Sequence, residues 1–118
     1  MKTVISDLFL KPDDNIYKAL AIINNQKIQI AFVVAKDLKL IGTITDGDVR
    51  RTIKNFKNPL ELDVSKIMSS EPKVIDSKTL ASDALKIMND NKITQIIVVE
   101  KGSYLGMVHM HQILNSGI

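Results

Sequence analysis

The sequence ALAIINNQKI at residues 19–28 recurs, with changes, as ALKIMNDNKI at residues 84–93. The match continues to two valine pairs, and eight of the sixteen positions from Ala19 to Val34 are identical in the second copy. Two copies in a chain of 118 residues make two small units, each too small to bury a sufficient core alone. We therefore expect the two copies to pack on each other.

Each copy predicts the order helix, strand, strand, helix. Ile16, Ala19, Leu20 and Ile23 follow the spacing i, i+3, i+4, i+7 and form one apolar helical face. We expect the N-caps of the first helix and its counterpart to be Asp14 and Thr79. Short β-branched runs predict the strands, and the closing helices come after them. The expected strands are 30–34, 40–44, 74–75, 95–99 and 105–108, and the closing helices are 49–53 and 110–114.

The composition is that of one compact globular domain, with 45% hydrophobic and 25% charged residues. No apolar run approaches the roughly 18 residues of a membrane-spanning helix, and the N-terminus has no signal-peptide pattern. We therefore expect a cytoplasmic protein with no membrane partner. The absence of cysteine excludes disulfides, thiolate nucleophiles and sulfur metal ligands.

The charge pattern argues against nucleic acid, and the residue pattern argues against catalysis. The net charge is +3, but the Lys and Arg residues are scattered among acids and Trp is absent. We expect no nucleic-acid partner. No nucleophile, base and orienting group cluster anywhere in the sequence, so we predict that the chain is not an enzyme.

The chemistry of the first copy concentrates at residues 45–51, between a strand and a helix N-terminus. A phosphate there could be met by backbone N–H groups and Thr45, and a carboxylate could accept from ribose hydroxyls. The candidate nucleotide-binding residues are Gly42, Thr45, Asp46, Asp48 and Arg51. A purely structural interpretation also fits: Thr45 or Asp46 caps the helix, Gly47 relieves the turn, and Asp48 pairs with Arg51.

The strand glycines Gly42 and Gly106 align in the two copies. Glycine inside a strand often marks the close approach of another backbone or a ligand, so we expect such an approach at both.

The family resemblance also begins at Gly42. Two helix–strand–strand copies, with Gly42, Thr45 and Asp48 at the ligand-signature positions, resemble a cystathionine-β-synthase (CBS) domain pair, or Bateman module. Segments 45–51, 92–95 and 109–114 are similar to the CBS pairs of arabinose-5-phosphate isomerases. The first half of the chain, from residues 10–13 through residues 29–31, is similar to the CBS pairs of some sugar nucleotidyltransferases.

This resemblance implies an α/β module of two CBS units, residues 1–57 and 58–118 with a linker at the start of the second. Two small sheets would pack with pseudo-twofold symmetry, with helices outside and ligand clefts between the units. It implies regulation by an adenine nucleotide, AMP, ADP or ATP, with Asp48 on the ribose and Thr45 near phosphate. The regulated enzyme would be a fused or partner sugar-phosphate isomerase or sugar nucleotidyltransferase. The alternative is a structural dimerisation module with empty clefts.

The second copy departs from the signature, with His109 at the place of Thr45 and Gln112 at the place of Asp48. Gln can hydrogen-bond ribose but has no charge, so we expect a weaker second nucleotide cleft at His109 and Gln112. His109 and His111 lack the i, i+4 spacing of metal ligands on one helix face, so we expect no metal. We also expect a homodimer, formed through apolar helix faces near Ile87, Met88 and Ile113.

Overall fold

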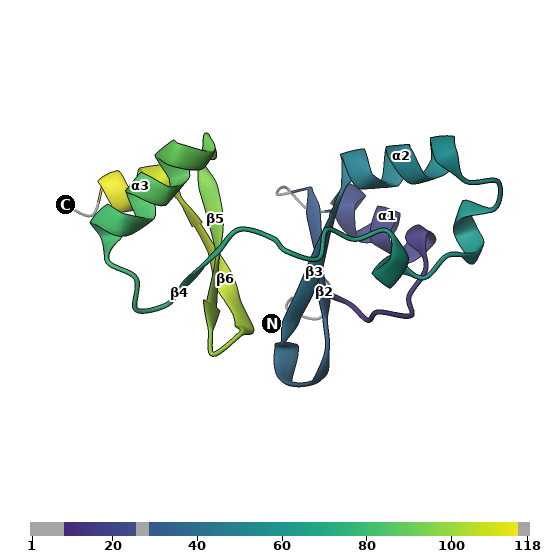
Figure 1. The fold of residues 1–118 in the computed structure, drawn as a ribbon, viewed down its shortest axis with the longest axis horizontal. Helices are drawn as coiled ribbons and strands as arrows, with labels where there is room; N and C mark the ends of the chain where they lie inside the picture. Colours follow the sequence, from purple (N-terminus) through teal and green to yellow (C-terminus); the bar gives the residue numbers. More distant parts are fainter. Residues whose placement is uncertain (1–8, 26–28, 116–118) are drawn as a thin grey trace. The chain divides into compact units, whose positions relative to one another are not determined.

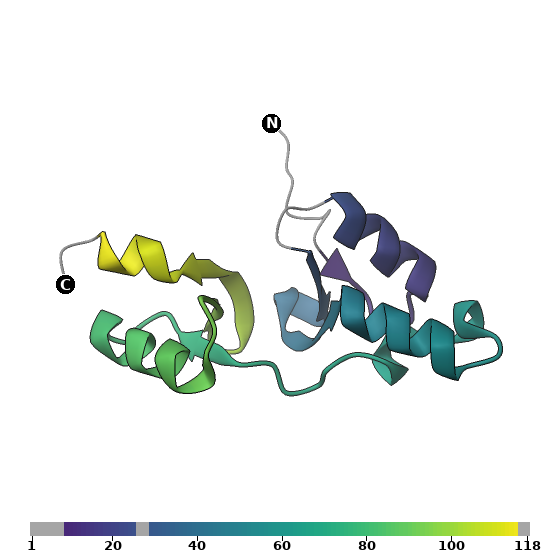
Figure 2. The same cartoon turned by 90° about the horizontal axis from the view of Figure 1, so that it is seen from above.

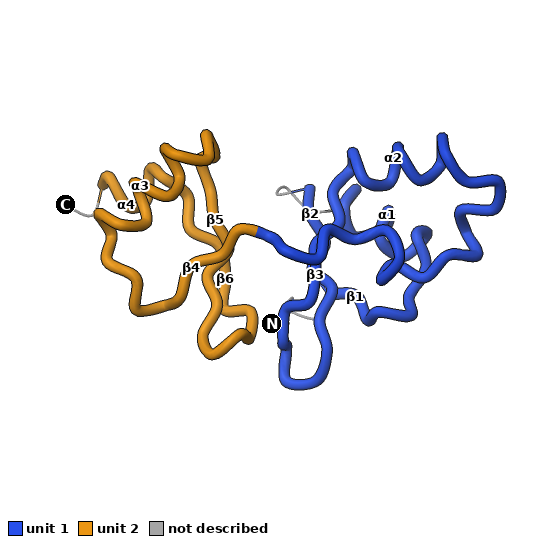
Figure 3. The backbone as a smooth tube through the Cα atoms, in the orientation of Figure 1, with its two compact units in different colours: residues 1–72 blue, residues 73–118 orange. Residues whose placement is uncertain are grey.

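The computed structural model describes residues 9–25 and 29–115, which fall into two compact units (Figures 1 and 3). The first unit spans residues 1–72 and the second spans residues 73–118. Each unit contains a three-stranded sheet and two α-helices among the described residues. The predicted α/β class, with one small sheet per repeat, is confirmed.

The first unit has the order β1 (Phe9–Leu10), α1 (Ile16–Asn25), β2 (Ile30–Val34), β3 (Leu40–Thr45) and α2 (Asp46–Asn55). β1 pairs with β2 in parallel, and β2 pairs with β3 antiparallel. Both helices lie on one face of this sheet (Figures 1 and 2). The hydrophobic core of the first unit lies between the sheet and the helices, where alternate strand residues pack against the apolar helix face. It consists of Leu10, Ile16, Ala19, Ile22, Ile23, Ala31, Val33, Ile44, Val49 and Val64.

The segment after α2 packs back on the first unit. It contains two short 3₁₀ helices, η3 (Pro59–Glu61) and η4 (Val64–Lys66). The Val64 side chain is fully buried in the core, and its N–H donates to the Asp14 carbonyl at 2.8 Å. Further on, Thr43 and Ser69 exchange two backbone hydrogen bonds of 3.0 and 2.9 Å. The chain between the repeats therefore adds an antiparallel bridge beside β3.

The second unit repeats the pattern with β4 (Val74–Asp76), α3 (Ala81–Asn91), β5 (Gln95–Glu100), β6 (Ser103–His109) and α4 (Met110–Leu114). β4 pairs with β5 in parallel, and β5 pairs with β6 antiparallel. Lys101 and Gly102 both have positive φ, as a two-residue hairpin loop requires. The buried core consists of Ile75, Ala84, Met88, Ile96 and Ile113.

Both predicted helix caps are wrong. α1 begins at Ile16, and the Asn15 side chain accepts from the Lys18 N–H at 3.2 Å, so Asn15 is the capping residue. Asp14 instead accepts from the Lys11 N–H at 2.7 Å, which stabilises the preceding turn. α3 has Leu80 at its N-cap with no side-chain hydrogen bond, and Thr79 lies one residue outside it.

The predicted apolar helix face of the second unit is largely internal. Met88 is fully buried and Ile113 is only 8% exposed, because both pack into the core of that unit. The exposed large apolar side chains on the helices of the second unit are Leu80 at the N-cap of α3 and Leu114 at the end of α4. On the helix α2 and the turn that follows they are Ile53, Phe56 and Leu60. Along the described residues, no helix has the length and apolar character needed to cross a bilayer.

Candidate functional site at the start of helix α2

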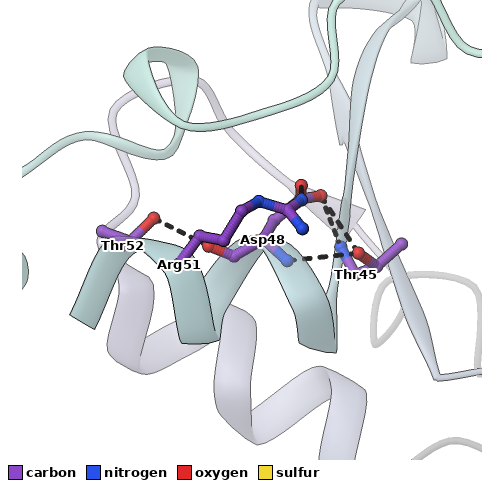
Figure 4. A network of polar contacts seen from close by, with 4 residues as sticks. All are labelled: Thr45, Asp48, Arg51 and Thr52. Carbon is purple, nitrogen blue, oxygen red and sulfur yellow. Dashed lines mark hydrogen bonds and ion pairs between the residues drawn. The ribbon is translucent and has the colours of Figure 1, made fainter. Parts of the chain in front are cut away.

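Thr45 and Asp48 form a reciprocal hydrogen-bonded cap where β3 becomes α2 (Figure 4). Thr45 keeps extended backbone angles and is the N-cap residue. Its hydroxyl accepts from the Asp48 N–H at 3.3 Å, and Asp48 Oδ2 accepts from the Thr45 N–H at 2.9 Å. Two of the unpaired N–H groups at this helix end are thus satisfied locally. The T-x-x-D spacing is the sequence signal for this cap.

The Asp48 carboxylate also binds Arg51. Arg51 Nη2 lies 2.5 Å from Asp48 Oδ1, and the Thr45 hydroxyl lies 3.2 Å from Oδ2 (Figure 4). The Asp48 side chain is only 14% exposed, whereas that of Arg51 is 67% exposed. A carboxylate has about four lone-pair positions, and the local donors occupy three of them. One position on Oδ1 remains for an incoming donor.

The other charged pair of this segment lies on the open side of the helix. Asp46 forms an i, i+4 ion pair with Arg50, and the two side chains are 46% and 78% exposed. Such a surface pair contributes about 0–1 kcal/mol to stability. Gly47 lies in the first turn of α2. Gly47 does not have a positive φ; among the described glycines, Gly102 does. The interpretation that Gly47 relieves the backbone of a turn is therefore wrong.

The two aligned strand glycines have different surroundings. A Cβ at Gly42 would lie 2.4 Å from Met68 Sδ and 2.9 Å from the Ser69 carbonyl oxygen. The predicted close approach of another backbone is therefore confirmed at Gly42. A Cβ at Gly106 would meet nothing within 4 Å among the described residues, so no backbone approaches Gly106 there, and the approach of a ligand to it stays a prediction.

The second copy builds a similar cap without a carboxylate. Gln112 Oε1 accepts from the His109 N–H at 2.7 Å, and His109 Nδ1 accepts from the His111 N–H at 3.3 Å. The two imidazole rings stack with centroids 5.0 Å apart and planes 7° apart. Within residues 9–25 and 29–115, no three His, Cys, Asp or Glu side chains gather as a metal site would require.

Comparison with known proteins identifies the family. The CBS domain family matches this chain twice, at residues 2–55 and 64–117. The chain belongs to the CBS domain family. Similar relatives include arabinose 5-phosphate isomerase KdsD of Francisella tularensis, which is 35% identical over 106 residues, covering 89% of this chain and 32% of the isomerase. The CBS pair spans about a third of the curated relatives it matches.

Solved structures show the same fold. A CBS domain-containing protein of Bacillus anthracis superposes with a TM-score of 0.79 at 17% identity, covering 96% of this chain and 88% of the other. CBSX2, solved in complex with AMP, superposes with a TM-score of 0.75 at 20% identity, covering 94% and 87%. The predicted family is therefore confirmed, including its relation to the isomerases.

Proposed function

We propose that this CBS pair is a regulatory module that binds an adenine nucleotide, AMP, ADP or ATP, at the start of α2. Thr45, Asp48 and Arg51 form the ligand-binding set, with Gly42 and Asp46 beside them in the sequence. The regulated enzyme would be a sugar-phosphate isomerase or sugar nucleotidyltransferase, fused to the module or binding it. The AMP complex of CBSX2 supports the ligand class, and the KdsD relatives support the enzyme class. We expect the module to act as a homodimer.

The observation that carries this proposal is the held Asp48 carboxylate. Its side chain is only 14% exposed, and the Thr45 donors fix its orientation before any ligand arrives. A ribose diol brings two O–H donors to a carboxylate with about one free position. One existing donor must therefore leave, and the exposed Arg51 is the one with freedom to move. Arg51 would then be available to pair with phosphate.

Regulation would follow from differential binding. A ligand shifts a protein between two arrangements only as far as it binds one of them more tightly. Exchange of the Asp48–Arg51 pair for ribose and phosphate contacts would supply that difference at α2. The ligand would thereby bias the state of the attached or partner enzyme. No catalytic role is assigned to the CBS pair itself.

A structural dimerisation module is the second candidate, and one observation favours it. His109 and Gln112 reproduce the helix cap of Thr45 and Asp48 although they contain no carboxylate. Thr45 and Asp48 can therefore cap the helix without also binding a ligand. Under this alternative no nucleotide binds, and the Asp48–Arg51 pair is only a surface contact.

Calorimetric titration of AMP, ADP and ATP separates the two candidates. The variant Asp48→Asn keeps a capping acceptor at the same position but removes the charge. We expect it to weaken binding by about 1.5–3 kcal/mol, the range for a hydrogen bond to a charged group. The matched control is Asp90→Asn, which makes the same charge change at the exposed Lys86–Asp90 pair on α3. Equal affinity in Asp48→Asn would exclude the ribose role, and no binding to the wild type would favour the structural module.

A further inference from the structure

The first unit contains a cavity of about 860 Å³ that the sequence did not reveal. Every described residue that lines it lies between Phe9 and Leu38, in the first unit. Small-molecule sites usually occupy about 300–1,000 Å³. The space is therefore large enough for a ligand of two fused rings or more.

This cavity lies at the opposite end of the sheet from the α2 site. Ile30 pairs with Thr45 at one end of the β2–β3 ladder, and Val34 pairs with Leu40 at the other. The cavity is lined by Val34 and the loop that follows β2. At about 3.3 Å a residue, the four residue steps from Ile30 to Val34 separate the two ends by roughly 13 Å. Figure 3 shows the β2–β3 loop and the start of α2 at opposite ends of the strands.

The walls of the cavity are mainly apolar. Phe9, Leu10 and Val34 come from the carboxyl ends of two neighbouring strands, and Leu38 comes from the loop after β2. Leu38 is 37% exposed and has φ 58°, directly after Asp37 with φ 60°. A left-handed backbone is strained for a bulky residue, and this one presents an aliphatic side chain to the open space. The corresponding hairpin of the second unit uses glycine, with Gly102 at φ 84°.

The charges at this cavity are predominantly positive. Lys11, Lys18 and Lys36 line it, against one carboxylate, that of Asp13. Lys18 is paired with Asp14 at 3.3 Å. Within the part of the chain that the structure describes, Lys11 and Lys36 form no ion pair. With Lys18 paired, Lys11 and Lys36 face the single carboxylate of Asp13, so the cavity keeps a positive excess. An apolar space with more ammonium than carboxylate groups is complementary to a molecule with an apolar body and an anionic head.

The geometry points to a second ligand site in the first unit, for an organic anion with an apolar ring system and one carboxylate or phosphate group. It does not depend on nucleotide binding at Asp48, because the two sites share no residue. The apolar walls would bind the ring system by burial, and Lys11 and Lys36 would select the anion. Leu38 would cover the bound ring system.

An amide-resolved NMR titration of the full chain tests this site. The probes are 2-naphthoate, 2-naphthyl phosphate and the neutral 2-naphthamide. We expect both anions to shift the backbone amide signals of residues 9–18 and 34–38. Both should bind about fivefold tighter than the neutral 2-naphthamide, as an ion pair predicts. The better of the two anions identifies the head group. Shifts elsewhere, no binding, or equal affinity for the amide would overturn the proposal.

Three variants separate the charge from the apolar walls. The double substitution Lys11→Gln with Lys36→Gln should remove the preference for the anions and leave the affinity for 2-naphthamide unchanged. Lys57→Gln with Lys73→Gln removes the same charge at exposed positions outside the cavity and should change nothing. Asparagine suits a left-handed backbone, so Leu38→Asn keeps the loop but removes the aliphatic side chain, and it should weaken the binding of all three probes. Anion affinity unchanged in the first variant, or lost equally in the second, would contradict the assignment.

Discussion

Replacing Gly42 by alanine tests the packing between β3 and the segment after α2. The new Cβ would lie 2.4 Å from Met68 Sδ, 2.7 Å from Met68 Cγ and 2.9 Å from the Ser69 carbonyl oxygen. Met68 can rotate away, but the Ser69 oxygen is backbone and accepts from the Thr43 N–H. The substitution therefore forces the bridge between Thr43 and Ser69 to shift.

The expected cost follows from three contributions. Overpacking a filled site costs about 1–3 kcal/mol. Weakening the two bridge hydrogen bonds, of 3.0 and 2.9 Å, costs up to about 1 kcal/mol each. Alanine regains about 0.5–1 kcal/mol relative to glycine in a strand. These contributions sum to about 0–4.5 kcal/mol, and we expect Gly42→Ala to lower the free energy of unfolding of the first unit by about 2 kcal/mol, the middle of that range.

The second copy provides the control. Gly106 occupies the aligned position in β6, and a Cβ there would meet nothing within 4 Å among the described residues. Gly106→Ala should leave the second unit unchanged or slightly more stable. Urea unfolding followed through the amide signals of each unit separates the two effects. A Gly42→Ala protein as stable as the wild type, or equal losses in both variants, would refute the packing described here.

Three further predictions concern the caps, the second copy and association. Thr45→Ala should destabilise the first unit by about 1 kcal/mol by removing a cap, and Thr45→Ser should restore it; equal urea midpoints for the two would contradict the cap. Gln112→Asp keeps a capping acceptor and adds the missing carboxylate, so it should add or strengthen a second nucleotide-binding event in calorimetry; an unchanged titration would argue against the carboxylate as the ribose ligand. Sedimentation equilibrium at micromolar concentration should give a homodimer, and a single species of 13.2 kDa would exclude it.

The regular elements could be predicted because periodicity determines which faces are buried. The apolar runs 30–34 and 95–99 are β2 and nearly all of β5, and 110–114 is α4. The N-caps could not be fixed, because a shift of one residue in the helix start moves the cap from Asp14 to Asn15. Side-chain capping preferences alone do not determine that boundary.

Features that depend on distant residues could not be predicted. Gly42 and Gly106 align in sequence, but only Gly42 has the Met68 side chain and the Ser69 backbone against it. The cavity of the first unit has the same origin, since Lys11 and Lys36 come together only through the parallel pairing of β1 and β2. For the α2 site, sequence spacing named Thr45, Asp48 and Arg51, but not that the carboxylate already holds three donors.

The number of nucleotides bound per chain tests the central proposal most directly. If the Asp48 carboxylate holds ribose, calorimetry with AMP should saturate near one nucleotide per chain, because Gln112 cannot provide the equivalent charge. Asp48→Gln, which copies the second cap into the first, should abolish that event while the protein stays folded. Two equivalent sites in the wild type, with no change in Asp48→Gln, would contradict the proposed role of this carboxylate.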